Sequence, residues 1–390
     1  MVKMSDGPRL LVLGAGVIGM SCAWRAAREG WSVTVLDPAP ASGASYVAGG
    51  MLAPVTETWP GEEALLTLGV AAVQEWPRFA VDLEAAAGRP AGLRTDGTLV
   101  AATGTGDRAE LDTLAGHLDR LGRPVERLTG RELRRREPAI GPDVRGGLSV
   151  PGDLAVDNRA LLVALRVAAD RADVMFEARA ARSVLDDGDR VLGVRCAEGP
   201  DVDADVVLVC AGAHSAALHP VLSGLVRPVK GEILRLAHRA GALPPPRHTV
   251  RALVDGRPIY AVPRDDGLVV GATQTETGFD TEVTVAGVRD LLRDAERVLP
   301  GIAEFALVES AAGLRPGSPD NLPLIGARGP AGLLVATGHH RNGILLAPLT
   351  AEAIAALLRG GPVPAPVRAA DPARLSHDVE EVPRARVDQR

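Results

Sequence analysis

Three glycines near the N-terminus have the spacing of a phosphate-binding turn. Residues 14–19 read GAGVIG, follow an apolar segment and open a helical one. Gly14 permits a tight turn, Gly16 lets the backbone approach a pyrophosphate, and Gly19 lets the helix pack close to the preceding strand. The free N–H groups and the positive dipole end of that helix favour phosphate oxygens. The pattern predicts a dinucleotide-binding turn, and a purely structural glycine turn is the alternative.

An acidic residue and a loop of small residues follow this turn. Asp37 ends the next apolar segment, where its carboxylate can accept hydrogen bonds from ribose hydroxyls. Residues 43–51 read GASYVAGGM, and a loop of such small residues can lie against a large flat cofactor. A flexible loop without a ligand is the alternative for this segment. The glycine pattern by itself does not separate NAD from FAD.

The elements that position these residues form a βαβ unit. Strands over 9–13 and 31–36 flank a helix over 17–29, which requires parallel strands joined by a right-handed crossover. Further helices are expected over 62–87, 107–121, 129–137, 157–172, 285–298 and 343–358. Further strands are expected over 93–102, 184–197, 201–210, 226–236, 259–263, 267–272 and 333–336. N-cap side chains are expected at Asp107, Thr129 and Asp157.

Composition excludes several classes of protein. The chain of 390 residues suits two connected domains, and its net charge of −6 without a long basic run argues against nucleic acid. Its three cysteines have no metal-ligand spacing and fit a reducing compartment. Residues 10–20 hold the glycine motif and not a cleavage site, and no uninterrupted apolar stretch reaches the length needed to cross a bilayer. We therefore expect a cytoplasmic protein without a membrane partner.

Four later stretches carry a family resemblance. They are 227–232 (RPVKGE), 271–273 (GAT), 313–316 (GLRP) and 338–348 (GHHRNGILLAP). With the N-terminal motifs they extend from about residue 10 to 350, and in this order the sequence resembles the D-amino-acid oxidase superfamily of flavoproteins. Within it, the sequence is most similar to the glycine oxidases of thiamine biosynthesis. The resemblance implies FAD, and no cysteine matches the covalent attachment point of sarcosine oxidases, so the FAD is expected to be non-covalent.

The stretch from Gly338 to Ile344 makes physical sense as a flavin site. A glycine-containing loop leads into a helix near Gly343, whose N-terminus can stabilise negative charge on a reduced flavin ring. The resemblance implies the same placement, and a plain strand-turn-helix element is the alternative. The adjacent His339 and His340 lack carboxylate or cysteine partners at metal spacing, so we interpret them as structural or pocket-rim residues.

Arg315 is the strongest candidate for substrate binding. It has no acidic neighbour at short range, and its planar guanidinium can hold a carboxylate with two hydrogen bonds. The resemblance assigns that role to it, places the Tyr260 hydroxyl nearby, and matches Arg341 and Met51 to residues lining the pocket. A surface arginine, and core packing for Tyr260 and Met51, are the alternatives. Catalytic or substrate-contacting roles are therefore expected for Arg315, Tyr260, Arg341 and Met51.

The cofactor-binding residues follow from the motifs and the resemblance together. They are Gly14, Ala15, Gly16, Val17, Ile18, Gly19, Asp37, Ser45, Ala48, Gly49, Gly50, Met51, Ala181, Ala211, Gly212, Gly338, His340, Arg341, Asn342, Gly343 and Ile344. The sequence departs from the family where Asp37 replaces the usual glutamate, which keeps the acceptor. Pro258 and Gln274 stand where glycine oxidases have apolar or ring-bearing residues, which puts the substrate preference in doubt.

The expected fold is α/β, with a Rossmann-like FAD-binding domain and an inserted substrate domain made of a mostly antiparallel β-sheet plus helices. The FAD-binding domain is expected to be discontinuous, over 1–90, 145–220 and 310–365. The substrate domain is expected over 91–144 and 221–309. Prolines and charges dominate the C-terminus, so 366–390 is expected to be a flexible tail.

The resemblance implies oxidative deamination of a small amino acid, with glycine favoured. Oxygen is the co-substrate, hydrogen peroxide and an imine or glyoxylate are the products, and the imine would supply thiazole synthesis. An FAD oxidase or dehydrogenase of sarcosine, a D-amino acid or another secondary amine is the main alternative. An NAD-dependent dehydrogenase and a non-catalytic protein that keeps the flavin fold are weaker ones. The resemblance also implies a homo-oligomer.

Overall fold

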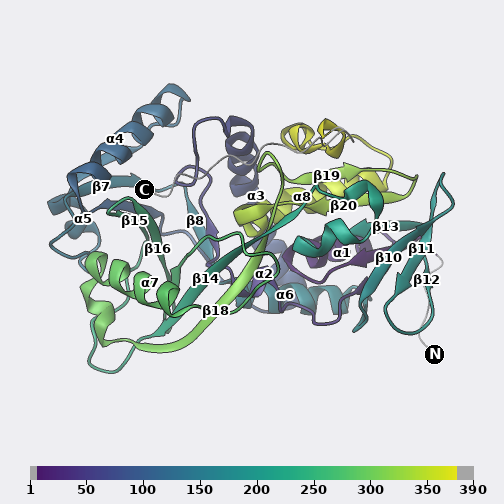
Figure 1. Cartoon of the computed structure of the whole chain (residues 1–390), viewed down its shortest axis with the longest axis horizontal. Coiled ribbons are helices and arrows are strands. Elements are labelled where there is room, and N and C mark those ends of the chain that lie inside the picture. Colours follow the sequence, from purple (N-terminus) through teal and green to yellow (C-terminus); the bar gives the residue numbers. More distant parts are fainter. Residues whose placement is uncertain (1–6, 376–390) are drawn as a thin grey trace.

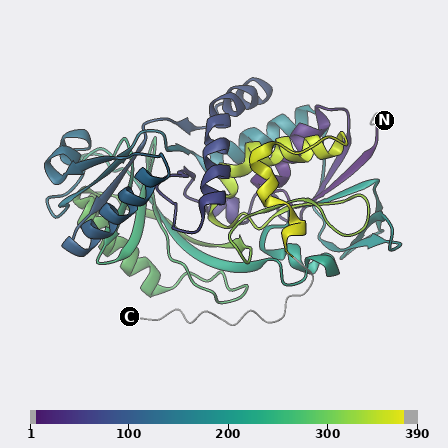
Figure 2. The ribbon, with the colours of Figure 1, turned by 90° about the horizontal axis from the view of Figure 1, so that it is seen from above.

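The computed structural model describes residues 7–375 and contains two large sheets at opposite ends of the long axis (Figures 1 and 2). The first sheet has six strands, in the order β19-β20-β13-β1-β2-β9. All neighbours are parallel except β19 and β20. Its strands are β19 (Leu324–Ala327), β20 (Leu333–Thr337), β13 (Val206–Val209), β1 (Arg9–Leu13), β2 (Ser32–Leu36) and β9 (Met175–Glu177).

Four helices form the core of this half with the sheet. They are α1 (Val17–Ala27), α3 (Glu63–Ala87), α6 (Asn158–Arg171) and α8 (Gly343–Leu358). Helix α1 packs against both α6 and α8, and α3 packs against the same two helices. Buried apolar side chains of these helices and of β1 and β2 belong to one continuous cluster. This packing fixes the start of α1, and so the glycine turn, at the carboxyl end of β1.

The second sheet has eight strands, in the order β18-β14-β17-β16-β15-β5-β7-β6, and all neighbours are antiparallel except β15 and β5. These strands are β18 (Ala306–Gly317), β14 (Arg227–Ala237), β17 (Gly267–Gly271), β16 (Arg257–Arg264), β15 (Thr249–Val254), β5 (Thr98–Ala102), β7 (Gly146–Val150) and β6 (Glu126–Thr129). Its helices are α4 (Thr105–Arg120), α5 (Gly130–Arg136) and α7 (Val285–Val298). The expected α/β architecture with a mostly antiparallel second sheet is confirmed.

Smaller elements complete the fold. One three-stranded sheet contains β10 (Ala181–Asp186), β11 (Val191–Cys196) and β12 (Val202–Asp203). Another contains β3 (Met51–Leu52), β8 (Leu154–Val156) and β4 (Leu93–Arg94). The short helix α2 (Ala44–Val47) contacts both β18 and α6, so the small-residue loop lies between the two halves.

Several expected elements have the predicted bounds, and others needed correction. The helices over 285–298 and 343–358 and the caps at Thr129 and Asp157 are confirmed. The Asp107 cap is wrong, because α4 begins after Gly104 and the Asp107 carboxylate accepts the Gly104 N–H instead. Two expected strands are divided at a glycine with positive φ. The strand over 93–102 is divided at Gly97, and the strand over 184–197 is divided at Gly188.

Two segments pair with a sheet other than the one their expected domain contains, while the domain boundaries themselves stay predictions. Strand β7 pairs with β5 and β6, and all of β18 pairs with β14, although 145–150 and 310–317 were expected in the FAD-binding domain. Antiparallel pairing with distant strands, which local sequence does not reveal, places these segments in the second sheet.

The expectation was that no uninterrupted apolar stretch is long enough to cross a bilayer, and one helical segment, interrupted by Arg341 and Glu352, comes near it. By length and composition one segment of the described residues qualifies, His340–Leu358, but 72% of its apolar window is buried inside the protein. It consists of α8 and the turn before it, and α8 packs against α1 and α3, which is the environment of a core helix.

The C-terminal expectation is wrong for its first part. Residues 365–370 and 372–374 form short 3-10 helices, and Val367 and Ala370 are fully buried. The remainder of the expected tail, 376–390, lies outside the described residues.

Candidate active site

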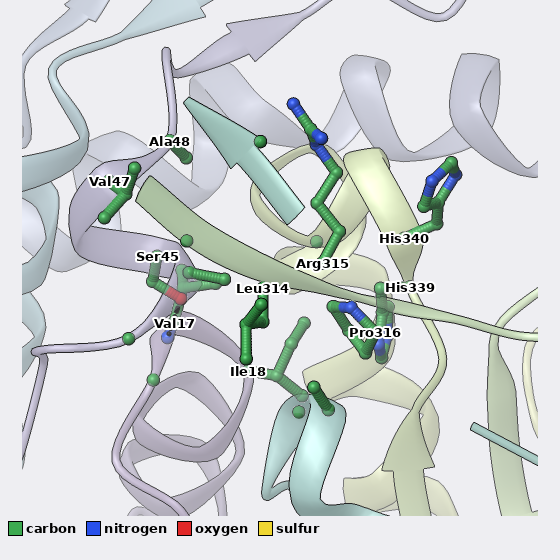
Figure 3. A pocket seen from close by; sticks show the side chains of 18 of the residues that line it. Val17, Ile18, Ser45, Val47, Ala48, Leu314, Arg315, Pro316, His339 and His340 are labelled. Atoms are coloured by element: carbon green, nitrogen blue, oxygen red, sulfur yellow. Dashed lines mark hydrogen bonds between the residues drawn. The ribbon is translucent and has the colours of Figure 1, made fainter. Parts of the chain in front are cut away.

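A cavity of about 890 Å³ lies between the two halves and brings together segments from the whole chain. One end is formed by the glycine turn, Asp37 and the loop over 43–51. The other end is formed by residues of the eight-stranded sheet and by the start of α8. Figure 3 shows this meeting, with Val17 and Ser45 on one side of β18 and His340 on the other.

The glycine turn is shaped by backbone contacts. Gly14 has φ +108°, and its N–H donates to the carbonyl of Leu36 at 2.9 Å. A Cβ added to Gly19 would lie 1.9 Å from the Gly14 carbonyl oxygen, so only glycine allows this approach of helix and strand. The Ser45 hydroxyl accepts the N–H of Val17 at 3.0 Å, which ties the small-residue loop to the N-terminus of α1.

Asp37 supports the turn directly. One carboxylate oxygen accepts the N–H of Ala15 at 2.7 Å, and the other accepts the N–H of Ala39 at 2.8 Å. The residue lines the cavity while making both contacts. A carboxylate oxygen has two lone pairs, so capacity remains for a ribose hydroxyl.

Most of the expected cofactor residues line the cavity. They are Gly14, Gly16, Val17, Ile18, Asp37, Ser45, Ala48, Gly49, Gly50, Met51, Ala181, Ala211, Gly212, His340, Arg341, Gly343 and Ile344. Four others lie behind its wall, namely Ala15, Gly19, Gly338 and Asn342. Ala15 and Gly19 shape the turn, and Gly338 reverses the chain with φ +72°. These four support the cavity without lining it.

Arg315 projects from β18 into the cavity. Its Nη1 donates to the carbonyls of Lys230 at 3.3 Å and Thr273 at 3.2 Å. A Cβ added to Gly231 on β14 would lie 2.2 Å from that Nη1, so this glycine leaves the space that the guanidinium occupies. Burial lowers the pKa of Arg315, while Tyr260 and Glu57 oppose the shift. Arginine stays charged in proteins, and Arg315 has no ion pair within residues 7–375.

Tyr260, on β16, lines the same cavity as Arg315 on β18. Added Cβ atoms would lie 2.3 Å from its hydroxyl at Gly271 and 2.7 Å from its ring at Gly49, so two glycines make room for the side chain. Burial raises the pKa of Tyr260, while Arg315 opposes the shift. The phenol is therefore protonated at neutral pH and can donate a hydrogen bond to an anion in the cavity.

The other two expected substrate contacts differ from each other. Met51 lies on β3, half-buried, and lines the cavity. Arg341 also lines it, but its Nη2 donates to the carbonyl of Glu57 and to the Glu62 carboxylate, both at 2.9 Å. Arg341 is thus already paired, which is a different environment from that of Arg315.

His339 and His340 are neutral at physiological pH. Burial lowers the pKa of both to about 3, and Arg341, Arg315 and Arg227 add to the effect at His340. His339 is bonded through Nε2 to the Thr350 hydroxyl at 3.1 Å. Within residues 7–375, no group of three histidine, cysteine or acidic side chains is arranged to hold a metal ion.

Sequence reasoning missed four polar residues of the site. Arg251 and Glu57 both line the cavity and form an ion pair at 2.9 Å. The buried Asn158 donates to the carbonyls of Ser45 at 2.9 Å and Tyr46 at 2.8 Å. Arg264 donates to the Gly49 carbonyl at 2.8 Å, and burial lowers its pKa to about 10. None of them belongs to a local motif, because each acts on a segment that is distant in sequence.

Comparison with known proteins identifies the family. A family model described as DAO, FAD dependent oxidoreductase, matches residues 9–357. The chain belongs to this family of FAD-dependent oxidoreductases.

Relatives in the DAO family differ in length. The bifunctional protein ThiO/ThiG of Trichormus variabilis is 32% identical over 89% of this chain, which spans about half (52%) of that protein. A glycine oxidase of Pseudomonas aeruginosa is 33% identical over 90% of this chain and 95% of its own length.

Solved structures in the comparison have the same fold. The glycine oxidase of Geobacillus kaustophilus superimposes with a TM-score of 0.86 at 30% identity and covers 95% of this chain and 100% of its own. The iminodiacetate oxidase of Chelativorans sp. BNC1 gives a TM-score of 0.81 at 29% identity, covering 93% and 99%.

The residues present fit the FAD of the DAO family. The free N-terminus of α1 and the glycine turn can hold the pyrophosphate, and Asp37 can bind a ribose. The start of α8 at Gly343 lies at the other end of the same cavity, where its dipole can face the flavin ring. An added Cβ at Gly212 would enter open space beside the cavity, which leaves room for a large ligand.

Proposed function

We propose that this protein oxidises a small amino acid, most favourably glycine, to its imine, with oxygen as the electron acceptor. The observation that carries the proposal is Arg315, a half-buried guanidinium that faces the cavity near Tyr260 without an ion-pair partner in residues 7–375. A partly buried charge that is bonded only to backbone carbonyls favours an anionic ligand. The carboxylate of an amino acid supplies that charge.

The residues of this chain act mainly by positioning. Arg315 holds the substrate carboxylate, and the protonated Tyr260 donates to it, so the amine end is directed away from β18. FAD, when bound, supplies a two-electron acceptor for the hydride of the α-carbon. The amine must be neutral for its lone pair to form the C=N bond. Water then converts the imine to glyoxylate and ammonia, and oxygen is reduced to hydrogen peroxide.

The finer parts of the proposal depend on the relatives. The name of a relative in Rhizobium etli, putative thiamine biosynthesis oxidoreductase ThiO, supports a role in thiamine biosynthesis, where the imine would supply thiazole synthesis. We also propose non-covalent FAD, because no cysteine matches the covalent attachment point of sarcosine oxidases and all three cysteines are buried. A cytoplasmic location, no nucleic-acid or membrane partner, and a homo-oligomeric state complete the proposal.

The test is anaerobic reduction of the purified protein by candidate amines. The oxidised flavin absorbs at about 450 nm, and glycine is expected to bleach it rapidly. Bleaching by sarcosine or a D-amino acid but not by glycine would keep the chemistry and replace the substrate. A yellow protein that no amine reduces would contradict the proposal.

A further inference from the structure

The stretch 230–232 (KGE) on β14 meets the substrate site with one residue and turns two charged residues away from it. Successive side chains of a strand point to opposite faces of its sheet. Gly231 lines the cavity and leaves the space that the Arg315 guanidinium occupies, whereas Lys230 and Glu232 lie behind the cavity wall. The side chains of Lys230 and Glu232 are only 3% and 4% exposed, and Nζ lies 3.9 Å from Oε1. Burial of charged groups is costly unless further bonds satisfy them, and here the two side chains bond to one segment, residues 273–284.

Glu232 bonds to both ends of this segment, which connects β17 to α7. Its Oε2 accepts the Thr273 hydroxyl at 3.1 Å, and its Oε1 accepts the N–H of Thr284 at 2.7 Å. The N–H of Glu232 also donates to the Thr273 hydroxyl at 2.9 Å. A Cβ added to Gly287, in the first turn of α7, would lie 1.7 Å from Oε2, so a glycine leaves room for the carboxylate at the N-terminus of that helix. One buried side chain thus fixes both ends of the segment.

Lys230 bonds to the middle of the same segment. Its Nζ donates to the Asp280 carboxylate at 2.5 Å. Its backbone N–H and carbonyl are bonded to Thr275 at 2.9 and 3.0 Å. Next to Asp280, the ring of Phe279 stacks on His214, with the ring centroids 4.9 Å apart, and His214 lines the cavity. The segment is therefore fixed between β14 and the half of the protein that contains the glycine turn.

Arg315 takes its position from this segment and from β14. Its Nη1 donates to the Thr273 carbonyl at 3.2 Å and to the Lys230 carbonyl at 3.3 Å. The Thr273 carbonyl belongs to the segment, so its place depends on the bonds that the Glu232 and Lys230 side chains make. A guanidinium that is bonded to backbone carbonyls moves with that backbone. The segment therefore sets where a carboxylate can bind, and small errors in that position weaken binding.

We propose that Glu232 and Lys230 are positioning residues for substrate binding. They hold residues 273–284 against β14, the Thr273 carbonyl then holds the Arg315 guanidinium, and the guanidinium receives the substrate carboxylate in a fixed orientation. This inference rests on the proposed function, because it takes Arg315 as the carboxylate site. Since Glu232 and Lys230 lie behind the cavity wall, both act through Arg315 and not on the substrate itself.

Two variants cut the two contacts separately. Asp280→Ala removes the partner of Lys230 from a side chain that is 40% exposed, and Glu232→Gln leaves one acceptor oxygen where there were two. Each should raise the KM for glycine about fivefold with little change in kcat, because a displaced Arg315 binds the carboxylate less well in both the ground state and the transition state. Asp280→Glu keeps the carboxylate and should restore most of the affinity. Asp290→Ala is the control, because Asp290 on α7 has a similar exposure of 37% and should leave the KM unchanged.

Combination with Arg315→Met tests whether these contacts act through Arg315. Once the guanidinium is gone its position no longer matters, so adding Asp280→Ala or Glu232→Gln to Arg315→Met should leave kcat/KM for glycine unchanged. A further loss of about fivefold in the double variants would overturn the inference, because the contacts would then act by another route. A lower melting temperature and FAD content in both single variants, with an unchanged KM, would also overturn it, because that is the result of a merely structural role.

Binding without turnover separates this inference from the proposed function. Methoxyacetate has a carboxylate but no amine, and its dissociation constant can be measured from the change that it makes in the flavin absorbance spectrum. We expect that constant to rise about fivefold in Asp280→Ala and to stay unchanged in Asp290→Ala. Failure of every amine to bleach the flavin, together with this loss of methoxyacetate affinity, overturns the proposed function and keeps the positioning role. Bleaching by glycine, with equal methoxyacetate affinity in all variants, overturns the positioning role and keeps the proposed function.

Discussion

The two ends of the cavity recognise their ligands by different means. At the nucleotide end the main features are backbone N–H groups and glycines, with Asp37 and Ser45 bonded to the backbone itself. At the substrate end the main features are charged side chains, with Arg315 and Arg251 on separate strands of one sheet. A site built from backbone is contained in a short segment, whereas a site built from side chains depends on the whole sheet.

This difference has a consequence for substitutions. A change at the nucleotide end should act on folding and FAD content together, because the same backbone forms the core and the site. A change at the substrate end should act on the substrate and leave FAD bound.

The largest effect is expected for Gly19→Ala. The new Cβ would lie 1.9 Å from the Gly14 carbonyl oxygen, which no side-chain movement can relieve. The free energy of unfolding should fall by about 3 kcal/mol or more, with loss of FAD. Thermal melting and the ratio of flavin to protein absorbance measure both. Gly116→Ala, inside α4 and with nothing nearer than 3.9 Å, is the control and should be neutral or stabilising.

Arg315→Met should reduce kcat/KM for glycine by about a hundredfold or more, because a charged partner of the carboxylate is lost. FAD content should equal that of the natural protein. Steady-state kinetics with a flavin absorbance spectrum measure the two properties separately. Loss of FAD along with activity would break the comparison between the two ends.

Acid should lower the free energy of unfolding through His339 and His340, which lie at the substrate end of the cavity. Both have a pKa of about 3 in the folded protein, below the ordinary 6.5. Between these values the unfolded chain takes up protons that the folded protein refuses, so stability is present above pH 6.5 and falls as the pH decreases. At pH 5 each histidine should lower the free energy of unfolding by about 2 kcal/mol.

The measurement is urea unfolding at pH 7 and pH 5. His340 has φ +47°, which asparagine tolerates, so His340→Asn should lose less stability on acidification than the natural protein does. His238→Asn changes an exposed histidine and is the control. An acid-induced loss identical in all three proteins would contradict the prediction.

Gly231→Ala should displace the Arg315 guanidinium, although the two residues are far apart in the sequence. The added Cβ would lie 2.2 Å from Nη1, and the guanidinium can move away because it is the end of a flexible side chain. We expect the KM for glycine to rise by about tenfold while FAD content stays normal. An unchanged KM would show that the position of Arg315 is not what holds the carboxylate.

The smallest effect is expected for Ser45→Ala. It removes the hydroxyl that accepts the Val17 N–H at 3.0 Å, but leaves the backbone of the turn intact. By analogy with loss of a helix cap, the cost should be about 1 kcal/mol, or about fivefold in FAD affinity. Titration of the apoprotein with FAD measures it. A much larger loss of FAD affinity would mean that side chains, and not only the backbone, bind the cofactor at the nucleotide end.

Local sequence patterns were enough to predict the βαβ unit, the glycine turn, the position of Asp37, and the helices over 285–298 and 343–358, because each depends on contacts within one short segment. It also predicted Arg315 and Tyr260, through motifs that surround them. It did not reveal that β18 belongs to the eight-stranded sheet, nor that Arg341 is paired with Glu62.

Which charged side chains meet depends on the long-range pairing of strands. Arg251 and Glu57 are separated by almost two hundred positions in the sequence, and their ion pair exists because β15 and the loop after β3 reach the same cavity. Gly231 has a role only because β14 and β18 lie side by side. Local patterns fix backbone geometry, but long-range pairing fixes the charges around a buried substrate, because electrostatic interactions depend on distance in space.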